Sequence, residues 1–314
     1  VTEVSLPSTL IEIGEKVFYG CRSLRSVTIP ESTRYIGYLA FAASGLESAV
    51  LPGTVSSYDL SIFERCTQLT DVVISEGIKW LEPYTFWNCT ALKNVTLPET
   101  MNNIEYAFIG CTSLESITLP EGLVRIQNAF ENCTSLKSIH LPGGVSVIGK
   151  KTFRNCTALT DVTMPGAMTI GEEAFYGCTS LESVTIPQWV TDIGVNAFVG
   201  CEKLAHVSLP DNMVSIYPGA FDGTALYNDP ANWEGDLFYL GNYLLSIRDK
   251  ATLEEAYIRE GITVITADMF RDCRNLKKVT ISDTVTTIED YAFYDCCNLT
   301  EVILPDSITT IGKN

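Results

Sequence analysis

The chain has 314 residues, 46% of them hydrophobic, with a formal net charge of −17 and a pI of about 4.5. So large an acidic excess disfavours nucleic acids and anionic membranes as partners, because their phosphates would be repelled. The sequence contains no run of 18 or more apolar residues, so it predicts no membrane-spanning segment. The first residues do not resemble a signal peptide. The composition therefore predicts a soluble monomer with a sizeable core, and the length alone would suggest about two domains.

A sequence repeat along the chain indicates one repetitive fold instead of two separate domains. Phenylalanine recurs at positions 18, 41, 63, 86, 108, 130, 153, 175, 198, 221, 270 and 293. Most cysteines, and prolines that follow an apolar residue, keep the same interval of 22 or 23 residues or a multiple of it. A fixed period of this size marks a solenoid. We therefore predict one solenoid over residues 1–314, with about 12 to 13 units and incomplete units at both ends.

The unit at 181–201 shows the predicted elements in chain order. Residues 183–186 alternate between polar and apolar, which is typical of a strand with one buried side. Pro187 ends this strand, because proline lacks the N–H that the next ladder bond would need. Ile193 and Phe198 are then predicted to line the inside of a return wall, with Gly194 at a bend. We expect this wall to consist of short strands and single helical turns.

Stacking of the units would bury the apolar face that no single unit can bury alone. The strands would then form one parallel, concave sheet with about 4.8 Å between rungs, and the coil would be right-handed. The predicted fold class is thus a right-handed repeat superhelix.

The rhythm breaks once, after Phe221. An aromatic segment at residues 227–255, called the island below, is inserted before the period returns at Tyr257. Within it, apolar runs at 237–240 and 243–247 flank Gly241-Asn242, which predicts a two-residue hairpin. Arg259 stands where the repeat would place proline.

Two interpretations of the island stay open. Its aromatic residues are of the kind that dominate binding interfaces, which makes Trp233, Tyr239 and Tyr243 candidate ligand contacts. Alternatively, the island is a widened rung whose aromatic side chains plug the core and whose hairpin supports one edge.

The eleven cysteines do not fall into the pattern of a disulfide framework. Ten occupy one position of the repeat, where stacked side chains would point the same way, so we expect free, inert thiols. Ser44 and Thr224 replace cysteine in two units, which indicates either a small packing site or a satisfied polar one. Cys297 lies outside the period and is expected to be an exposed thiol. The spacing predicts no metal site.

The outward positions of the predicted strands carry the remaining candidate contacts. They form a polar surface of low relief, without a strong field or a deep pocket. The residues selected from it are Asp71, Thr96, Thr118, His140, Asp161, Thr163, Thr185, His206 and Tyr257. The two histidines would lie about 14 Å apart on the strand spacing, too far for a shared metal or a proton relay.

The unit L-x-x-V-x-I-P-x-x-V-x-x-I-G-x-x-A-F-x-x-C resembles the leucine-rich repeats of the BspA-like, or Treponema pallidum, type. The units 159–178 and 181–201 match this signature almost throughout. The resemblance implies a curved solenoid on bacterial surface or secreted proteins, with binding roles and no catalytic residues. Aromatic islands like 227–255 also occur in this family.

Two functions from different classes follow. The first is a non-catalytic extracellular recognition or adhesion module that binds a protein or glycan on the concave face. The second is a structural spacer that projects another domain from the cell surface and has no ligand of its own. No phosphate-binding loop, nucleophile elbow or zinc-protease motif is present, so we expect no enzyme and no cofactor. Because no capping segment is evident, we also expect either that the natural protein is longer or that neighbouring molecules cap the ends.

Overall fold

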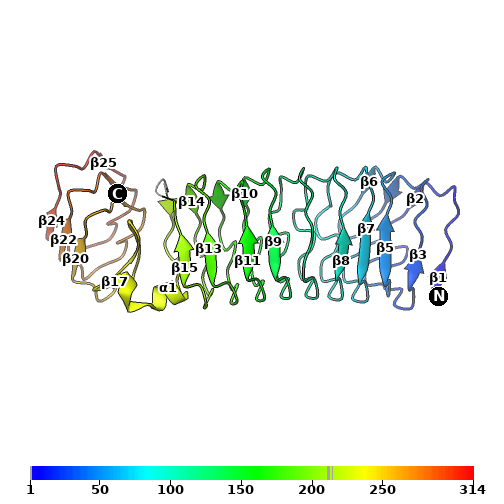
Figure 1. Cartoon of the computed structure of the whole chain (residues 1–314), viewed down its shortest axis with the longest axis horizontal. Helices are drawn as coiled ribbons and strands as arrows, with labels where there is room; N and C mark the ends of the chain where they lie inside the picture. The colour runs from blue at the N-terminus through cyan, green and yellow to red at the C-terminus, as the bar shows by residue number, and fades with distance from the viewer. Residues whose placement is uncertain (1, 211–212, 214) are drawn as a thin grey trace.

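The computed structural model describes residues 2–210, 213 and 215–314. It is an elongated parallel-strand solenoid of about 13 turns, with successive rungs side by side along the long axis (Figure 1). The predicted repeat solenoid and its period are confirmed.

The strand wall contains one short strand in most rungs. These strands are β1 (Glu3–Val4), β3 (Ser26–Val27), β5 (Ser48–Leu51), β7 (Asp71–Ile74), β8 (Asn94–Thr96), β9 (Ser138–His140), β11 (Asp161–Thr163), β13 (Ser183–Thr185), β15 (His206–Ser208), β20 (Glu255–Ile258), β22 (Lys278–Ile281) and β24 (Glu301–Ile303). Neighbours pair in parallel and in register, for example Val72 with Val95 and Val184 with Val207.

The return wall contains two-residue strands. They are β2 (Glu12–Ile13), β4 (Tyr35–Ile36), β6 (Ser57–Tyr58), β10 (Val147–Ile148), β12 (Thr169–Ile170), β14 (Asp192–Ile193), β16 (Ser215–Ile216), β21 (Val264–Ile265), β23 (Thr287–Ile288) and β25 (Thr310–Ile311). Single bridges from Trp80 to Asn103 and from Asn103 to Arg125 continue the ladder between β6 and β10.

The predicted single sheet is interrupted along the strand wall. The described strands form separate ladders, β1-β3, β5-β7-β8, β9-β11, β13-β15 and β20-β22-β24, and residues 114–120 form no strand. Each strand is only two to four residues long, so a small misalignment removes a whole ladder. Single backbone hydrogen bonds still cross two of the gaps. They run from Glu47 N–H to the Arg25 carbonyl and from Lys137 N–H to the Glu115 carbonyl, and each is 3.0 Å long.

The turns around each phenylalanine are arches and not the helical turns that we predicted. The residues two before and two after the ring have left-handed backbone, as at Lys151 (φ 56°) and Asn155 (φ 59°) on either side of Phe153. This alternation directs the N–H groups of all three residues toward carbonyls of the following rung, over 2.7 to 3.0 Å. Helical backbone would have kept those donors inside the turn. The only described helices, α1 (Ala225–Asn228) and the 3-10 helix η1 (Pro230–Asn232), belong to the island.

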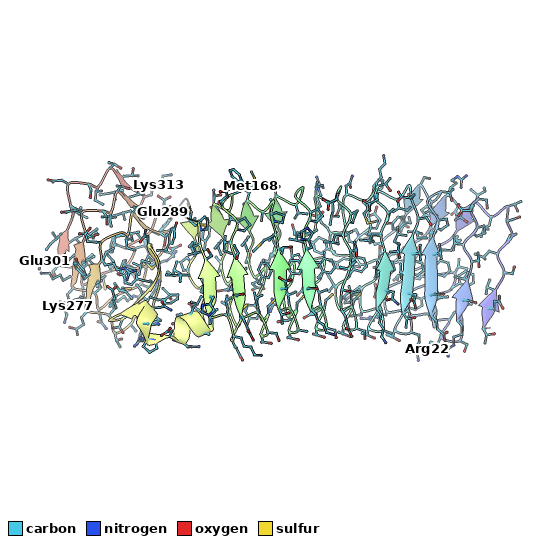
Figure 2. All side chains as sticks on the ribbon, in the orientation of Figure 1. Arg22, Met168, Lys277, Glu289, Glu301 and Lys313 are labelled. Carbon is cyan, nitrogen blue, oxygen red and sulfur yellow. The ribbon has the colours of Figure 1, made fainter. Side chains whose placement is uncertain are left out.

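Phenylalanine rings form a column through the core. From Phe18 to Phe221 ten successive rings are stacked, with centroids 5.1 to 5.8 Å apart and planes within 18° of parallel. The column stops at the island and resumes with Phe270 and Phe293 at 5.1 Å. Figure 2 shows the side chains along the solenoid, and the rings from Phe41 to Phe221 are fully buried among them. Offset stacking at this spacing is favourable beyond the area that it buries.

The cysteines form a second column. All eleven are free, as predicted, and Cys297 is exposed. In eight rungs the thiol donates to the phenylalanine carbonyl of the rung before it, over 3.0 to 3.3 Å; these are Cys66, Cys89, Cys111, Cys133, Cys156, Cys178, Cys201 and Cys296. Ser44 is buried 3.4 Å from the Cys66 sulfur, and Thr224 donates to the Phe221 carbonyl, so the position is a satisfied polar site.

The island separates two hydrophobic cores. Its strands are β17 (Trp233–Glu234), β18 (Leu237–Leu240) and β19 (Tyr243–Ile247), and β18 pairs with β19 in the antiparallel hairpin predicted at Gly241-Asn242. Phe238 and Leu245 on one face belong to the core of the preceding rungs. Leu237, Tyr239, Leu244 and Ile247 belong to the core of the following rungs. The hairpin is therefore buried on both faces, which supports the widened-rung interpretation.

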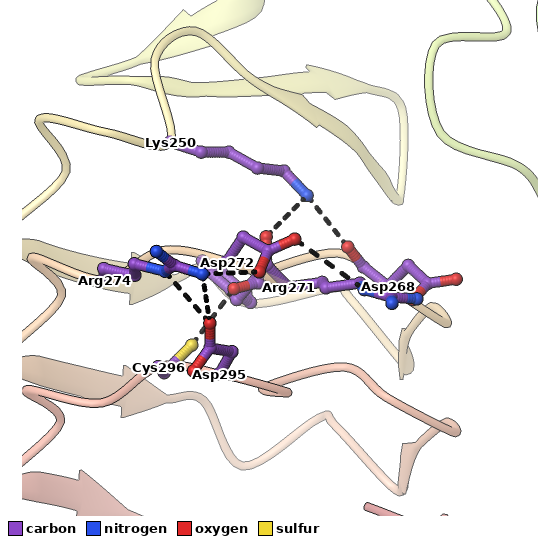
Figure 3. A network of polar contacts seen from close by, with 8 residues as sticks. Lys250, Asp268, Arg271, Asp272, Arg274, Asp295 and Cys296 are labelled. Atoms are coloured by element: carbon purple, nitrogen blue, oxygen red, sulfur yellow. Dashed lines mark hydrogen bonds and ion pairs between the residues drawn. The ribbon is translucent and has the colours of Figure 1, made fainter.

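The Lys250 side chain takes the place of a backbone donor that is missing next to the island. Elsewhere the carbonyl after each phenylalanine accepts from an N–H of the rung before, as Tyr294 does from Asp272 over 2.9 Å. No regular rung precedes Arg271, and its carbonyl accepts from the Lys250 ammonium over 3.2 Å (Figure 3). The same ammonium donates to the Asp268 carbonyl over 2.9 Å. Burial lowers the pKa of Lys250.

Arg259 fastens the hairpin to the next rung. Its guanidinium pairs with Glu234, donates to the Gly241 carbonyl over 2.6 Å and lies 4.3 Å from the centre of the Tyr239 ring. Proline at this position, as the repeat would have it, could make none of these contacts.

The buried thiols predict a loss of stability in alkali. Burial raises the pKa of Cys66 to about 11 and of Cys133 to about 12, and raises the pKa of Cys89, Cys111 and Cys156 as well. Unfolding exposes thiols that ionise near pH 8.5, so the unfolded state binds fewer protons above that pH. Each such thiol should then lower the free energy of unfolding by about 1.4 kcal/mol per pH unit, until the pH reaches its folded pKa.

Urea unfolding between pH 7 and 10, in the presence of a reductant, measures this slope. The Cys133→Ser variant should keep the fold, because serine already occupies the equivalent position at Ser44. Its free energy of unfolding should fall less steeply with pH, by the contribution of one thiol. A free energy of unfolding that stays constant across this range would contradict the prediction.

Arg259→Ala should loosen the hairpin while the rungs stay folded. We expect amide hydrogen exchange in residues 237–247 to accelerate about tenfold, which corresponds to the loss of one or two charge-assisted bonds. Arg259→Lys keeps the charge but loses the planar guanidinium, and should give an intermediate rate. Exchange at 138–163, which is distant in the solenoid, provides the internal control. Equal rates in wild type and Arg259→Ala would rule out this anchoring role.

Candidate binding surface

The outward residues of the strand wall form a continuous accessible surface, called the strand face. In strands such as β5, β7 and β13, two residues point away from the core and alternate with buried ones. Of the predicted contacts, Asp71, Thr96, Thr118, His140, Asp161, Thr163, Thr185, His206 and Tyr257 are all exposed. Thr118 lies in the rung that forms no strand, so its backbone is not fixed by a ladder.

Hydrogen bonds between rungs orient several of these side chains. Asn94 donates to one oxygen of Asp71 over 2.7 Å, and Thr70 donates to the other over 2.5 Å. The bonds from Thr70 and then Asn94 hold the pKa of Asp71 below its ordinary value. Asp71 is therefore a fixed acceptor that stays ionised at neutral pH.

A second pair lies further along the face. His140 and Thr163 are opposite each other on β9 and β11, and the histidine Nδ1 and threonine hydroxyl are hydrogen-bonded. His206 is opposite Ser183 on the separate β13-β15 ladder. The structure thus brings His140 to Thr163 but does not bring the two histidines together.

Charges at the edge of the strand face pair between neighbouring rungs. Glu115 pairs with Lys137 over 2.6 Å, Glu254 with Lys277 over 2.8 Å and Lys278 with Glu301 over 2.7 Å. Lys277 and Glu301 are labelled at the margin of the last rungs in Figure 2. Exposed pairs of this kind contribute little stability. They do cancel charge, which agrees with the weak field expected for this face.

The relief of the strand face changes where the island meets the following rungs. A hollow of about 390 Å³ lies there, between the β17–β18 turn on one side and β20 and β22 on the other. Tyr257 stands in it with 57% of its surface exposed. The other polar lining residues are Glu234, Asp236, Glu255, Lys278 and Thr280.

The three aromatic residues of the island that we predicted as ligand contacts differ in how far they are exposed. Tyr239 is only 2% exposed, and burial raises its pKa to about 12, so its selection as a surface contact was wrong. It belongs to the second core, and its hydroxyl donates to the Tyr257 carbonyl over 3.1 Å. Trp233 is half-buried under the guanidinium of Arg248. Tyr243 is half-buried too, and its hydroxyl donates to the Pro210 carbonyl over 2.9 Å.

The acidic wall of the hollow, Glu234 and Asp236, was not among the predicted contacts. Both flank Gly235, whose φ of 63° gives the short turn between β17 and β18. The sequence Trp-Glu-Gly-Asp-Leu carries this turn signal, but nothing in it indicates that the turn faces Tyr257, more than twenty residues away.

Within the described residues there is no group of three or more His, Cys, Asp or Glu side chains that could hold a metal ion. In the same part of the chain, no helix is long and apolar enough to cross a membrane. What the surface offers chemically is a set of fixed hydroxyl, carboxylate and imidazole groups along one wall, with one exposed aromatic ring in a hollow.

Comparison with solved structures gives bacterial leucine-rich-repeat proteins. One from Bacteroides ovatus is 24% identical, with a TM-score of 0.54 over 85% of this chain and 71% of that one. One from Eubacterium ventriosum is 23% identical, with a TM-score of 0.49 over 99% and 81%. A leucine-rich cell surface protein from Faecalibacterium prausnitzii is 22% identical, with a TM-score of 0.44 over 96% and 87%. At these identities the first likeness shows the fold.

No curated protein is significantly similar to the chain. The model of the BspA type leucine rich repeat region, however, matches residues 1–107, 81–169, 104–228 and 246–314, which together span nearly all of it. The period, the phenylalanine and cysteine columns and these matches agree, and the chain belongs to the BspA-type leucine-rich-repeat family.

Proposed function

We propose that the protein is a non-catalytic extracellular recognition module that binds a protein or glycan across its strand face. The hollow around Tyr257 carries this proposal, because it is where a low, polar face gains both relief and an exposed aromatic ring. Tyrosine is enriched among the residues that dominate binding energy, since it offers a large rigid surface with a polar tip.

The rest of the strand face supports an extended contact. The Asp71–Asn94 and His140–Thr163 pairs are already oriented by the fold, so binding would cost little side-chain entropy. Solenoids present such surfaces along their whole length. Asp71, Thr96, Thr118, His140, Asp161, Thr163, Thr185 and His206 would then contact the outer parts of a ligand that is anchored at Tyr257.

The same proposal includes an extracellular location and a monomeric state. The family resemblance implies a secreted or surface-attached protein, and the net charge of −17 favours a monomer through repulsion between copies. Adhesion to a host or matrix component would be the consequence of such a contact.

The test begins with the whole chain on arrays of extracellular matrix proteins, host-surface proteins and glycans. Each ligand found is then titrated against wild type and Tyr257→Ala. Loss of the anchor should weaken binding at least tenfold, or about 1.4 kcal/mol. Trp189→Ala is the matched control, because Trp189 is equally exposed, at 57%, but lies in the turn after β13. It should change affinity less than twofold.

Two results would count against the proposal. Equal binding by wild type and Tyr257→Ala would show that the hollow is not the anchor. Absence of any ligand on all arrays would instead favour the spacer function.

A further inference from the structure

The turn edge of the first rungs carries a second hollow, distant from Tyr257. Its volume is about 630 Å³, within the range of about 300 to 1,000 Å³ that is usual for small-ligand sites. Three arginines line it, Arg22, Arg25 and Arg65, in a chain whose net charge is −17. Figure 2 labels Arg22 at this edge of the solenoid, beside β3 and β5.

The hollow, called the notch below, exists because one rung is short of a residue. Leucine follows phenylalanine by six positions in the rungs on both sides, at Phe18–Leu24 and Phe63–Leu69, but by five at Phe41–Leu46. Residues of the two longer turns, among them Arg22 on one side and Arg65 on the other, line the notch. Residues 42–45, Ala-Ala-Ser-Gly, form its floor and have small side chains that leave the space open.

The floor is held tightly against the rung before it. Gly45 N–H donates to the Cys21 carbonyl over 3.1 Å, and a Cβ at Gly45 would lie only 2.1 Å from the Arg22 carbonyl oxygen. Only glycine fits so close an approach. Ser44 is buried below, next to the Cys66 sulfur. The notch is thus a fixed feature of the backbone rather than a gap between mobile side chains.

The charge in the notch is positive after its ion pairs are counted. Arg25 lies 3.5 Å from Glu47, and Arg65 lies 3.7 Å from Glu64. The Arg65 guanidinium also lies 4.9 Å from the centre of the Trp87 ring, which orients it. Within residues 2–210, the guanidinium of Arg22 has no hydrogen bond or ion pair. Three guanidinium groups are therefore accompanied by two carboxylates at ion-pair distance, and of these only Glu64 lines the notch.

The remaining lining groups indicate what kind of anion would fit. Tyr19 contributes an exposed ring, Thr67 a hydroxyl and Gln68 an amide. The lining residues include no valine, leucine, isoleucine, methionine or phenylalanine, so the lining does not favour the aliphatic side chains of an acidic peptide. A hydroxylated ring that carries an acid group would use all of these: its charge would contact the arginines, its hydroxyls Thr67 and Gln68, and its face Tyr19.

We propose that the notch is a binding site for an acidic sugar, with a carboxylate or sulfate held by Arg22, Arg25 and Arg65. This site is independent of the strand-face contact at Tyr257, so either can fail alone. The two anions share the chemistry of planar or tetrahedral oxygens that guanidinium groups bind through two hydrogen bonds.

The experiment titrates the whole chain with sialyllactose, whose charge is a carboxylate, with sulfated lactose, whose charge is a sulfate, and with neutral lactose. Both charged sugars should bind, and lactose should bind at least tenfold more weakly, because it lacks the charge-assisted bonds. Arg22→Ala and Arg65→Ala should each weaken binding about tenfold by the same reasoning. Arg125→Ala removes an exposed arginine from the return wall and should leave affinity within twofold. Inorganic sulfate should compete.

A second variant tests the notch without touching an arginine. Residues 42–45 are replaced by the five residues 176–180, which form the same turn at the common length in a later rung. The graft should fold, which the thermal midpoint and circular dichroism verify, and should lose binding by filling the notch. The relative affinity of the two charged sugars distinguishes carboxylate from sulfate.

Four results would each overturn the proposal. Lactose binds as tightly as the charged sugars, or the graft or the arginine variants bind like wild type. Inorganic sulfate binds while neither charged sugar does, or nothing binds at all.

Discussion

The whole structure depends on backbone hydrogen bonds that join each rung to the next at the phenylalanine turns. Left-handed residues two before and two after each ring direct alternate N–H groups along the solenoid axis. For residues other than glycine and asparagine this conformation costs about 1 to 2 kcal/mol each. At positions such as Lys151 and Glu173 this unfavourable conformation is offset by the hydrogen bonds that each arch makes to its neighbour. The phenylalanine and cysteine columns follow from that register, since they occupy equivalent points on equally spaced turns.

The same register explains where binding features can arise. A strand face built from equivalent positions is uniform, and uniform surfaces have little relief. Relief appears only where the repeat is altered. The island raises a turn beside Tyr257, and the missing residue after Phe41 lowers the floor between two longer turns. Both candidate sites therefore lie at departures from the period, where the fold no longer dictates the side chains.

Much of this architecture could be predicted from the sequence, because a period is a long-range signal. The spacing of Phe and Cys predicted the stacking and the free thiols, and the apolar runs on either side of Gly241-Asn242 predicted the hairpin. The sequence could not predict the arches, since turn conformation depends on bonds to the next rung and not on local propensity. Nor could it show that Tyr239 is buried, because the hairpin has one core on each face and alternation along it gives no exposed side. The hollow at Tyr257 depends on the β17–β18 turn standing opposite β20 and β22, which local sequence patterns do not indicate.

The partition made by the island has a mechanical meaning. Nearest-neighbour coupling carries cooperativity along a repeat protein only where consecutive repeats share an interface. At residues 237–247 that coupling passes through a hairpin, Lys250 and Arg259 instead of a regular rung. Unfolding that begins at one end, under mechanical force or by local opening, would therefore be interrupted at the island. Because the hydrophobic core is divided there into two clusters, we expect the long amino-terminal segment and the short carboxy-terminal one to unfold as separate cooperative blocks.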